Sequence, residues 1–228
     1  MRTIIHIGQH KTGTTSIQHY LKNKRIELAK EGLYVPESLV GFDHPSHFIL
    51  NVYALNQNRS SSMKDNLLAT KPSEFFAGLQ QTLEDDISRH YHNANGQGCK
   101  DIIWSNEGLY LLNSVEEYKR LLELFDKYSS KVVCVCCFRE LESYKLSYMK
   151  QLKKQGIGFS DDRDSYRYVK DDSWLFDYKQ KEKILRQVFE KVIIFPYDKR
   201  DMVKTFMKQI GYFITDGDSI RLNVTKHT

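Results

Sequence analysis

The sequence predicts an α/β fold in which a parallel sheet of four to five strands has helices on both faces. Four short segments are apolar at consecutive positions rather than at alternate ones: residues 3–7, 101–105, 131–138 and 191–195. Uninterrupted apolar runs of this length are typical of strands that are buried on both faces. A helical pattern follows each run, and this alternation predicts βαβ units with right-handed crossovers.

The helices of the first half can be placed from apolar spacing and capping residues. A stripe spaced by three and four residues predicts a helix over about residues 14–30, ended by Gly32. A second stripe predicts a helix over about residues 74–91, with Ser73 as its cap. The run Ser114-Val115-Glu116-Glu117 has the form of a capping box, so a third helix is expected to begin there.

The second half continues the alternation. Helices are predicted over about residues 140–155, 174–190 and 199–210, the last between Asp198 and Gly211. Two segments, residues 36–63 and 156–172, show little periodicity. Long irregular segments in a compact domain are often functional, and in an open parallel sheet they lie near the carboxyl ends of the strands. We therefore expect these two segments to build the substrate pocket.

Length and composition restrict the class of protein. The chain has 228 residues and shows no repeat, low-complexity tract or linker, so a single domain over residues 1–228 is expected. Its formal net charge of +5 is mild. Such a charge suits an anionic ligand, but without a dense basic stripe or an aromatic platform it does not indicate nucleic-acid binding.

The start of the chain and its cysteines bear on location. Residue 1 leads directly into a predicted strand, so no signal peptide is expected, and no apolar run approaches the roughly 18 residues that a membrane span needs. Three of the four cysteines lie in one apolar run, and no histidine follows at metal-ligand spacing. We expect reduced, buried thiols, no metal site and a cytoplasmic protein.

The most informative segment is the loop after the first predicted strand, Gly8-Gln9-His10-Lys11-Thr12-Gly13-Thr14-Thr15-Ser16. A glycine-rich turn that opens a helix directs N–H groups, hydroxyls and one ammonium at a single point, where the helix N-terminus adds partial positive charge. This predicts a phosphate site and a P-loop type of sheet. In an ATP or GTP loop of the Walker A kind, however, the lysine follows the second glycine, whereas Lys11 precedes Gly13.

Residues 10–18 resemble the 5′-phosphosulfate loop of the sulfotransferase family that uses 3′-phosphoadenylyl sulfate (PAPS), above all its bacterial and carbohydrate-type members. The resemblance implies PAPS as donor, 3′,5′-ADP as product and no obligatory metal. It also implies that Lys11 is the catalytic cation near the leaving oxygen. The donor's 5′ end would be held by the loop, in the order His10, Lys11, Thr12, Gly13, Thr14, Thr15 and Ser16.

A second segment extends the resemblance. Arg139 directly follows the predicted strand 131–138, and Ser147 comes eight residues later on the next helix. The family has an arginine and a serine in this arrangement to hold the donor's 3′-phosphate. The chemistry is suitable, because a guanidinium forms bidentate hydrogen bonds with phosphate oxygens and a hydroxyl adds another. Taken alone, Arg139 could instead pair with Glu142.

Three further segments are similar to family segments but less specific. They are the late strand and turn at residues 192–198, the triplet Asn223-Val224-Thr225, and the triplet Ser105-Asn106-Glu107 that follows the second predicted strand. Glu107 is a candidate for orienting Lys11 or the acceptor.

The general base is less sharply indicated. The family places a glutamate or histidine after the first helix, and here His47, His44 and Glu37 compete, in that order of preference. A neutral imidazole has a suitable pKa near 7. His10, beside Lys11, is expected either to line the acceptor side or to donate a hydrogen bond to the sulfate.

The function that these residues indicate is sulfuryl transfer from PAPS to a hydroxyl or amine of an acceptor, a carbohydrate or glycolipid by resemblance. Two alternatives stay open. One is a P-loop nucleotide or small-molecule kinase, against which the displaced lysine and the lack of a clear Mg²⁺-binding aspartate argue. The other is a non-catalytic module that binds a nucleotide.

Overall fold

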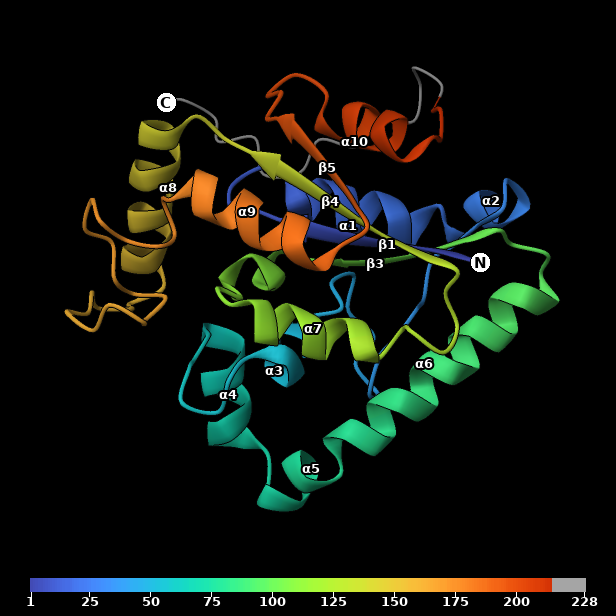
Figure 1. The fold of residues 1–228 in the computed structure, drawn as a ribbon, viewed down its shortest axis with the longest axis horizontal. Helices are drawn as coiled ribbons and strands as arrows, with labels where there is room; N and C mark the ends of the chain where they lie inside the picture. The colour runs from blue at the N-terminus through green and yellow to red at the C-terminus, as the bar shows by residue number, and fades with distance from the viewer. Residues whose placement is uncertain (215–228) are drawn as a thin grey trace.

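The computed structural model describes residues 1–214, and these form one five-stranded parallel sheet with helices on both faces (Figure 1). The sheet order is β2-β3-β1-β4-β5, with β1 (Arg2–Gly8) in the centre. The other strands are β2 (Leu33–Tyr34), β3 (Asp101–Asn106), β4 (Lys131–Phe138) and β5 (Lys191–Pro196). The predicted fold class is therefore confirmed, and the fifth strand is β2.

Helices account for most of the remaining regular structure. Within residues 1–214 they are α1 (Thr14–Asn23), α2 (Arg25–Lys30), α3 (Ile49–Ala54), α4 (Ser62–Thr70), α5 (Ser73–Ala77), α6 (Leu79–Gly96), the 3₁₀ helix η1 (Glu107–Leu111), α7 (Val115–Glu123), α8 (Leu141–Lys154), α9 (Tyr178–Val188) and α10 (Met202–Ile210). No helix of this described part is long and apolar enough to cross a membrane.

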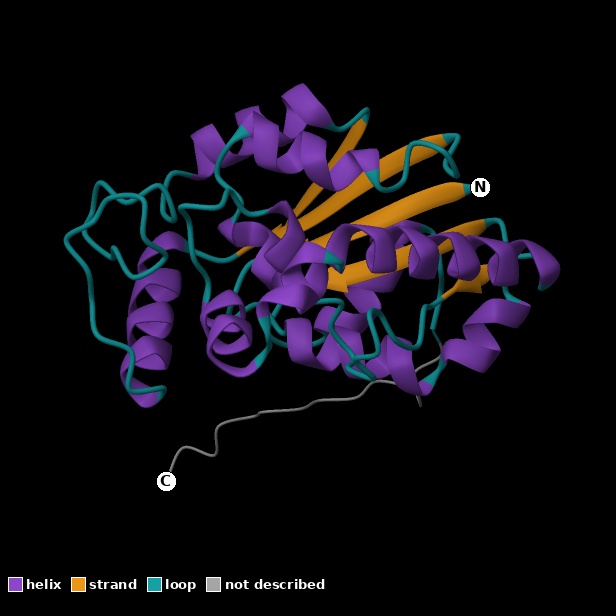
Figure 2. Cartoon of the chain, turned by 90° about the horizontal axis from the view of Figure 1, so that it is seen from below, coloured by secondary structure: helices purple, strands orange, loops and turns teal. Residues whose placement is uncertain are grey.

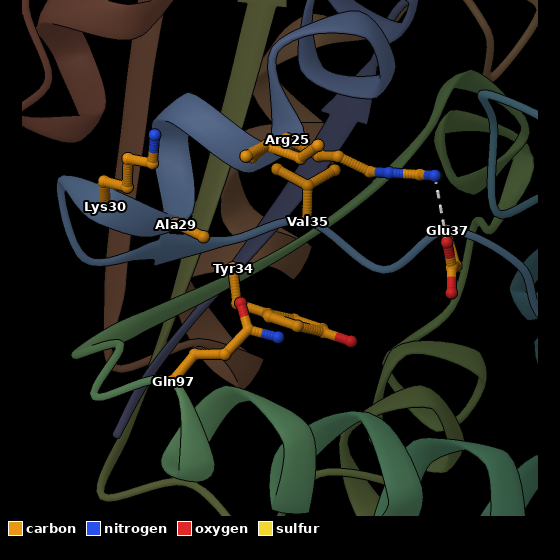
Figure 3. A pocket seen from close by; sticks show the side chains of 8 residues that line it. Arg25, Ala29, Lys30, Tyr34, Val35, Glu37 and Gln97 are labelled. Atoms are coloured by element: carbon orange, nitrogen blue, oxygen red, sulfur yellow. Dashed lines mark ion pairs between the residues drawn. The ribbon is translucent and has the colours of Figure 1, made fainter.

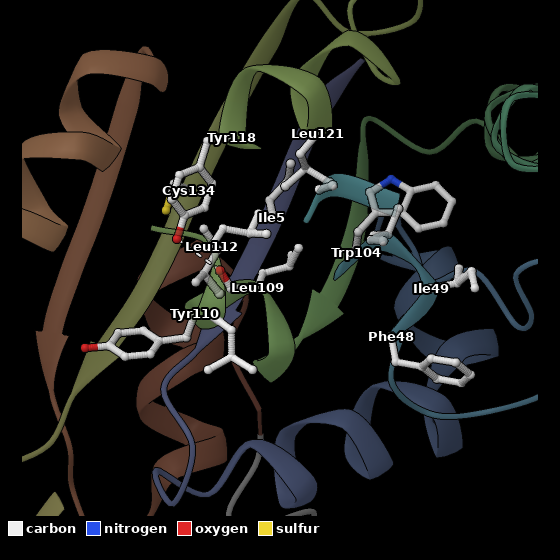
Figure 4. Packing of buried hydrophobic residues seen from close by; sticks show 14 of the residues in the cluster. Ile5, Phe48, Ile49, Trp104, Leu109, Tyr110, Leu112, Tyr118, Leu121 and Cys134 are labelled. Carbon is white, nitrogen blue, oxygen red and sulfur yellow. Dashed lines mark hydrogen bonds between the residues drawn. The ribbon is translucent and has the colours of Figure 1, made fainter. Parts of the chain in front are cut away.

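Successive residues of the strands face opposite sides of the sheet and enter two separate cores. Ile4, Ile103 and Val133 pack in the core beneath α1, α2 and α10. Their neighbours Ile5, Trp104 and Cys134 pack in the other core, which includes side chains of α3, α6, α7 and α9 (Figure 4). Figure 2 shows the strands fanned between these helical layers. Burial on both faces explains the uninterrupted apolar runs.

The sheet order brings three loops together. β1 pairs in parallel with both β3 and β4, with Ile7 opposite Asn106 and Gly8 opposite Cys137. The carboxyl ends of three adjacent strands therefore lie at the same edge, where ligands bind in open parallel sheets. The helix α8 and the irregular segment after it also stand at this end, away from the N-terminus (Figure 1).

Two predicted helices are divided in the structure. The helix expected over residues 14–30 breaks at Lys24, whose backbone is not helical, to give α1 and α2. The helix expected over residues 74–91 breaks at Gly78 into α5 and α6. Ser73 was wrongly expected to cap it: Pro72 occupies the cap position and Ser73 is the first helical residue.

Other helix starts shift with the residue that caps them. Asp177 accepts a hydrogen bond from the Gln180 N–H, so α9 begins at Tyr178 rather than near residue 174. Asp201 does the same for α10, which therefore begins later than the expected residue 199. Ser114 caps α7 as predicted, by accepting a hydrogen bond from the Glu117 N–H.

The expected irregular segment 36–63 contains α3 and the start of α4, and a buried ion pair fastens it to α7. Arg59 Nη1 lies 2.6 Å from Glu117 Oε2, with both side chains almost fully buried. The same carboxylate accepts hydrogen bonds from the backbone N–H groups of Asn56 and Asn113.

The four cysteines are free and buried, as predicted. The triplet Asn223-Val224-Thr225 lies outside the described residues.

The buried pair leads to a prediction about stability. Arg59→Met leaves the Glu117 carboxylate buried without its cation, so we expect the free energy of unfolding to fall by about 3 kcal/mol. Urea denaturation followed by circular dichroism measures it. The exposed pair of Arg186 and Glu182 on α9, 2.7 Å apart, supplies the control, because Arg186→Met should cost less than about 1 kcal/mol. Equal losses in the two variants would contradict this role.

Candidate functional site

The loop between β1 and α1 folds into a tight turn that leaves the start of α1 open to an anion. Lys11 and Gly13 have positive φ angles of 68° and 75°. Gly8 is required for a close approach, since a Cβ there would overlap the Cγ2 methyl of Thr14. The Thr12 hydroxyl donates to the Gln9 carbonyl at 2.6 Å and closes the turn. The N-cap residue Gly13 has no side chain that could cap α1, and the first turn of the helix holds no acidic residue, so this turn itself does not offset the positive end of the helix dipole.

The side chains of the loop divide into two groups. Thr12 is fully buried, and Thr14 and Ser16 are nearly so, whereas Lys11 and Thr15 are exposed. The Thr12 hydroxyl is engaged within the loop, so its first role is to shape the turn. An exposed ammonium and an exposed hydroxyl at the start of a helix form a donor set that suits the phosphate and sulfate oxygens of a nucleotide.

Arg139 reaches this loop directly. It is the first residue after β4, and the pairing of β4 with β1 brings it beside the turn. Its Nη1 donates to the Lys11 carbonyl at 2.9 Å, its Nε donates to the Ser143 hydroxyl at 2.8 Å, and its guanidinium lies 5.3 Å from the ring centre of Tyr197. The structure thus brings together the two motifs that the sequence places 128 residues apart. Glu142 pairs with Lys145 instead.

Ser147 lies one helical turn after Ser143 on α8, and residues four apart share a side of a helix. It is half-buried. Tyr144 and Tyr148 on the same helix are buried in the core, as their spacing predicted. The ring of His10 packs edge-on against Tyr148, with ring centres 5.5 Å apart, so α8 also borders the loop.

His47, the first choice for the base, is built into the backbone beside β3. Its Nδ1 accepts a hydrogen bond from the Ser105 N–H at 3.0 Å, so its Nε2 carries the proton and faces the Pro36 carbonyl at 3.3 Å. The ring packs on Trp104, and burial lowers the pKa of His47 to about 4. In this arrangement both ring nitrogens are engaged with the backbone, so neither is free to take a proton from an acceptor substrate. The role of His47 as a base stays a prediction that its contacts do not favour.

The other two choices lie in different surroundings. His44 is exposed, and its Nδ1 accepts a hydrogen bond from the Ser46 N–H at 3.0 Å. Glu37 forms an ion pair of 3.0 Å with Arg25 at a pocket of about 410 Å³ (Figure 3). That pocket is lined by residues of α2, by β2 and the residues after it, and by Gln97 at the end of α6, and neither the loop nor Arg139 contributes to it.

His10 directly precedes Lys11, and Glu107, the first residue after β3, lies near enough to affect the pKa of His10. Burial lowers the pKa of His10, the negative charge of Glu107 opposes that shift, and the charge of Lys11 adds to it. Among the described contacts the buried His10 Nδ1 has no hydrogen-bond partner. Glu107 Oε2 accepts from Gln18 Nε2 at 2.5 Å and lies 3.5 Å from the Ser46 hydroxyl, which links α1 to the end of β3.

Sequence reasoning included Gln9 and Gln18 in the loop segment but assigned neither of them a role. Gln18 offers a signal in hindsight, because it lies one turn into the helix that the loop opens. Gln9 is a fully buried amide directly after a buried strand, where a polar side chain needs partners of its own.

Within residues 1–214, no three histidine, cysteine, aspartate or glutamate side chains gather in a way that could hold a metal ion.

Comparison with known proteins gives a match in structure only. No family model matches the chain, and no curated protein sequence does. The crystal structure of a sulfotransferase from Alicyclobacillus acidocaldarius superposes with a TM-score of 0.53, over 98% of this chain and 87% of that one, with 15% of residues identical. Likeness at this level of identity concerns the fold. The chain therefore has the fold of a sulfotransferase.

Proposed function

We propose that the protein transfers a sulfuryl group from PAPS to a hydroxyl or amine of an acceptor. The observation that carries this proposal is the 2.9 Å hydrogen bond from Arg139 to the carbonyl of Lys11. It sets a guanidinium beside the open N-terminus of α1, so that two anion-binding groups share one side of the sheet. A nucleotide with phosphate groups on both its 5′ and 3′ positions needs two such groups.

The loop and Arg139 bind different phosphate groups of the donor nucleotide. Thr14, Thr15, Ser16 and the N–H groups of Gly13, Thr14 and Thr15 hold the 5′-phosphate, with His10 and Thr12 completing the loop. Arg139 and Ser147 take the 3′-phosphate. Lys11 stabilises the charge that develops on the bridging oxygen as its bond to sulfur breaks and the acceptor oxygen bonds to sulfur. 3′,5′-ADP then leaves, and the cations of the chain supply the stabilisation without an obligatory metal.

For the base we favour His10. The support is the unpartnered Nδ1 of His10, the effect of the Glu107 charge on its pKa, and its position next to Lys11. His44 stays a second candidate, since it is exposed near the same segment. His47 then serves to hold residues 36–47 against β3.

The acceptor class and the location rest on narrower support. The resemblance of residues 10–18 to carbohydrate-type members favours a carbohydrate or glycolipid acceptor. Four free, buried thiols suit a reducing compartment, and we place the protein in the cytoplasm.

The donor assignment is tested by nucleotide binding. Wild-type protein should bind 3′,5′-ADP more tightly than 5′-AMP in calorimetry, and Arg139→Ala should weaken 3′,5′-ADP by about 30-fold while changing 5′-AMP little, because only the first ligand has a 3′-phosphate. Arg186→Ala, on the exposed side of α9, is the control. Tighter binding of ATP with Mg²⁺ than of 3′,5′-ADP would favour a kinase and reject the proposal.

Lys11 should matter for turnover rather than for folding. Lys11→Ala keeps a Cβ at the positive φ angle, so the backbone of the loop is under the same constraint. Removal of the ammonium should lower kcat by about 100-fold or more. Release of 3′,5′-ADP from PAPS in the presence of a panel of oligosaccharides measures the rate, and Lys11→Arg should recover part of it. Near-normal turnover of the alanine variant would remove Lys11 from the reaction.

The choice of base predicts a pH profile. A base acts in its neutral form, and burial holds the pKa of His10 below the ordinary value of 6.5. The midpoint of the acidic limb of the rate profile should therefore lie below pH 6.5, since the rate falls as His10 becomes protonated. His10→Gln should abolish this acidic limb together with most of the rate, whereas His47→Gln should lower the melting temperature and leave the limb in place. The reverse result would return the role to His47.

A further inference from the structure

We propose that Gln9 and Tyr178 act as positioning residues that hold Arg139 at a set place relative to the loop, and so determine the selection of nucleotides that carry a 3′-phosphate in addition to a 5′-phosphate. This inference rests on the proposed function. It concerns two residues that the donor does not need to touch.

The Gln9 amide joins three elements that are distant in sequence. The side chain is fully buried. Its Nε2 donates to the Tyr110 hydroxyl of η1 at 3.2 Å and to the Tyr178 hydroxyl of α9 at 2.9 Å. Its Oε1 accepts from the Arg139 backbone N–H at 2.8 Å. All three polar positions that face these partners are therefore used.

The orientation of this amide follows from its partners. The Tyr110 hydroxyl donates to the Leu175 carbonyl at 3.0 Å, and the Tyr178 hydroxyl donates to the Arg139 carbonyl at 2.8 Å. Each hydroxyl has a single proton, so both need a donor on the Gln9 side, which only the NH₂ group supplies. The Gln9 oxygen is then left for the Arg139 N–H. An apolar side chain at position 9 would leave the Arg139 N–H without this acceptor and both hydroxyls without this donor.

Both backbone groups of Arg139 are fixed by this network. Arg139 lies between the end of β4 and the start of α8, where the sheet ladder no longer pairs the chain. The Arg139 N–H donates to the Gln9 side chain, and the Arg139 carbonyl accepts from the Tyr178 hydroxyl. The Tyr178 ring is itself held by stacking on Phe138, with centres 4.6 Å apart and planes inclined by 19°. The direction in which the guanidinium leaves the backbone is set accordingly.

The same residue also shapes the loop. The Gln9 carbonyl accepts the Thr12 hydroxyl that closes the turn. One residue thus determines where the 5′ end and the 3′-phosphate group would be held, and a shift of Arg139 relative to the loop changes the span between them. A ligand that uses both groups senses this span, whereas a ligand with a 5′-phosphate alone does not.

The chain offers a matched pair of variants for the test. Tyr178→Phe and Tyr110→Phe each remove one buried hydroxyl that accepts from Gln9, and both keep the aromatic ring. They differ in one respect, because only the Tyr178 hydroxyl also bonds to Arg139. Calorimetry with 3′,5′-ADP and with 5′-AMP gives the ratio of the two dissociation constants for the full chain, and melting temperatures report on the fold. Gln9→Met is a third variant that keeps much of the side-chain volume.

Tyr178→Phe is expected to reduce the preference for 3′,5′-ADP over 5′-AMP by about tenfold, as for a lost hydrogen bond that orients a charged group. Gln9→Met should do at least as much, and Tyr110→Phe should leave the preference within about twofold. If the wild type prefers 3′,5′-ADP and the two phenylalanine variants alter that preference equally or not at all, the positioning role is overturned while the proposed function stands. If the wild type shows no preference, both are overturned.

Discussion

The hydrogen-bonded ladder between β1 and β4 is the constraint on which the rest of the site depends. Because Gly8 lies opposite Cys137, both strands end at the same level, and the turn after one meets the arginine after the other. No long-range attraction between charged side chains is needed to bring them together. The apolar residues that make the strands buried thus also determine where the polar ends converge, which ties the energetics of the core to the geometry of the site.

The site is arranged so that its positive groups exist before any ligand arrives. The N-cap of α1 is a glycine, Lys11 is exposed, and the Arg139 guanidinium is held by Ser143 and the Lys11 carbonyl. A set of donors in fixed positions needs little reorganisation during a reaction that develops charge, which is the main electrostatic contribution of enzymes. The buried His47, by contrast, has a structural role, because its ring links the Pro36 carbonyl to the Ser105 N–H of β3.

The sequence could predict those parts of the structure that depend on patterns within a short segment of the chain. The four longer strands contain apolar residues at consecutive positions, as expected for strands that are covered on both faces. The loop and Arg139 directly follow two of these strands, so their position at the strand ends can be recognised. The two residues of β2 are too few to form a pattern. The break at Gly78 falls at a residue of low helix propensity, whereas the break at Lys24 falls at a good helix former, where propensity predicts none. The contacts of Gln9 with Tyr110 and Tyr178 span 101 and 169 residues, so only the folded chain reveals them.

The two outer strands have a consequence for how the molecule behaves among its copies. β2 offers only two residues of free edge, and β5 ends at Pro196, which lacks an N–H, and begins with the exposed Lys191. Short edges, lysine and proline are the features by which natural sheets avoid pairing with another sheet and aggregating. In the described part of the chain, both outer strands thus carry features that hinder the addition of a strand from a second copy.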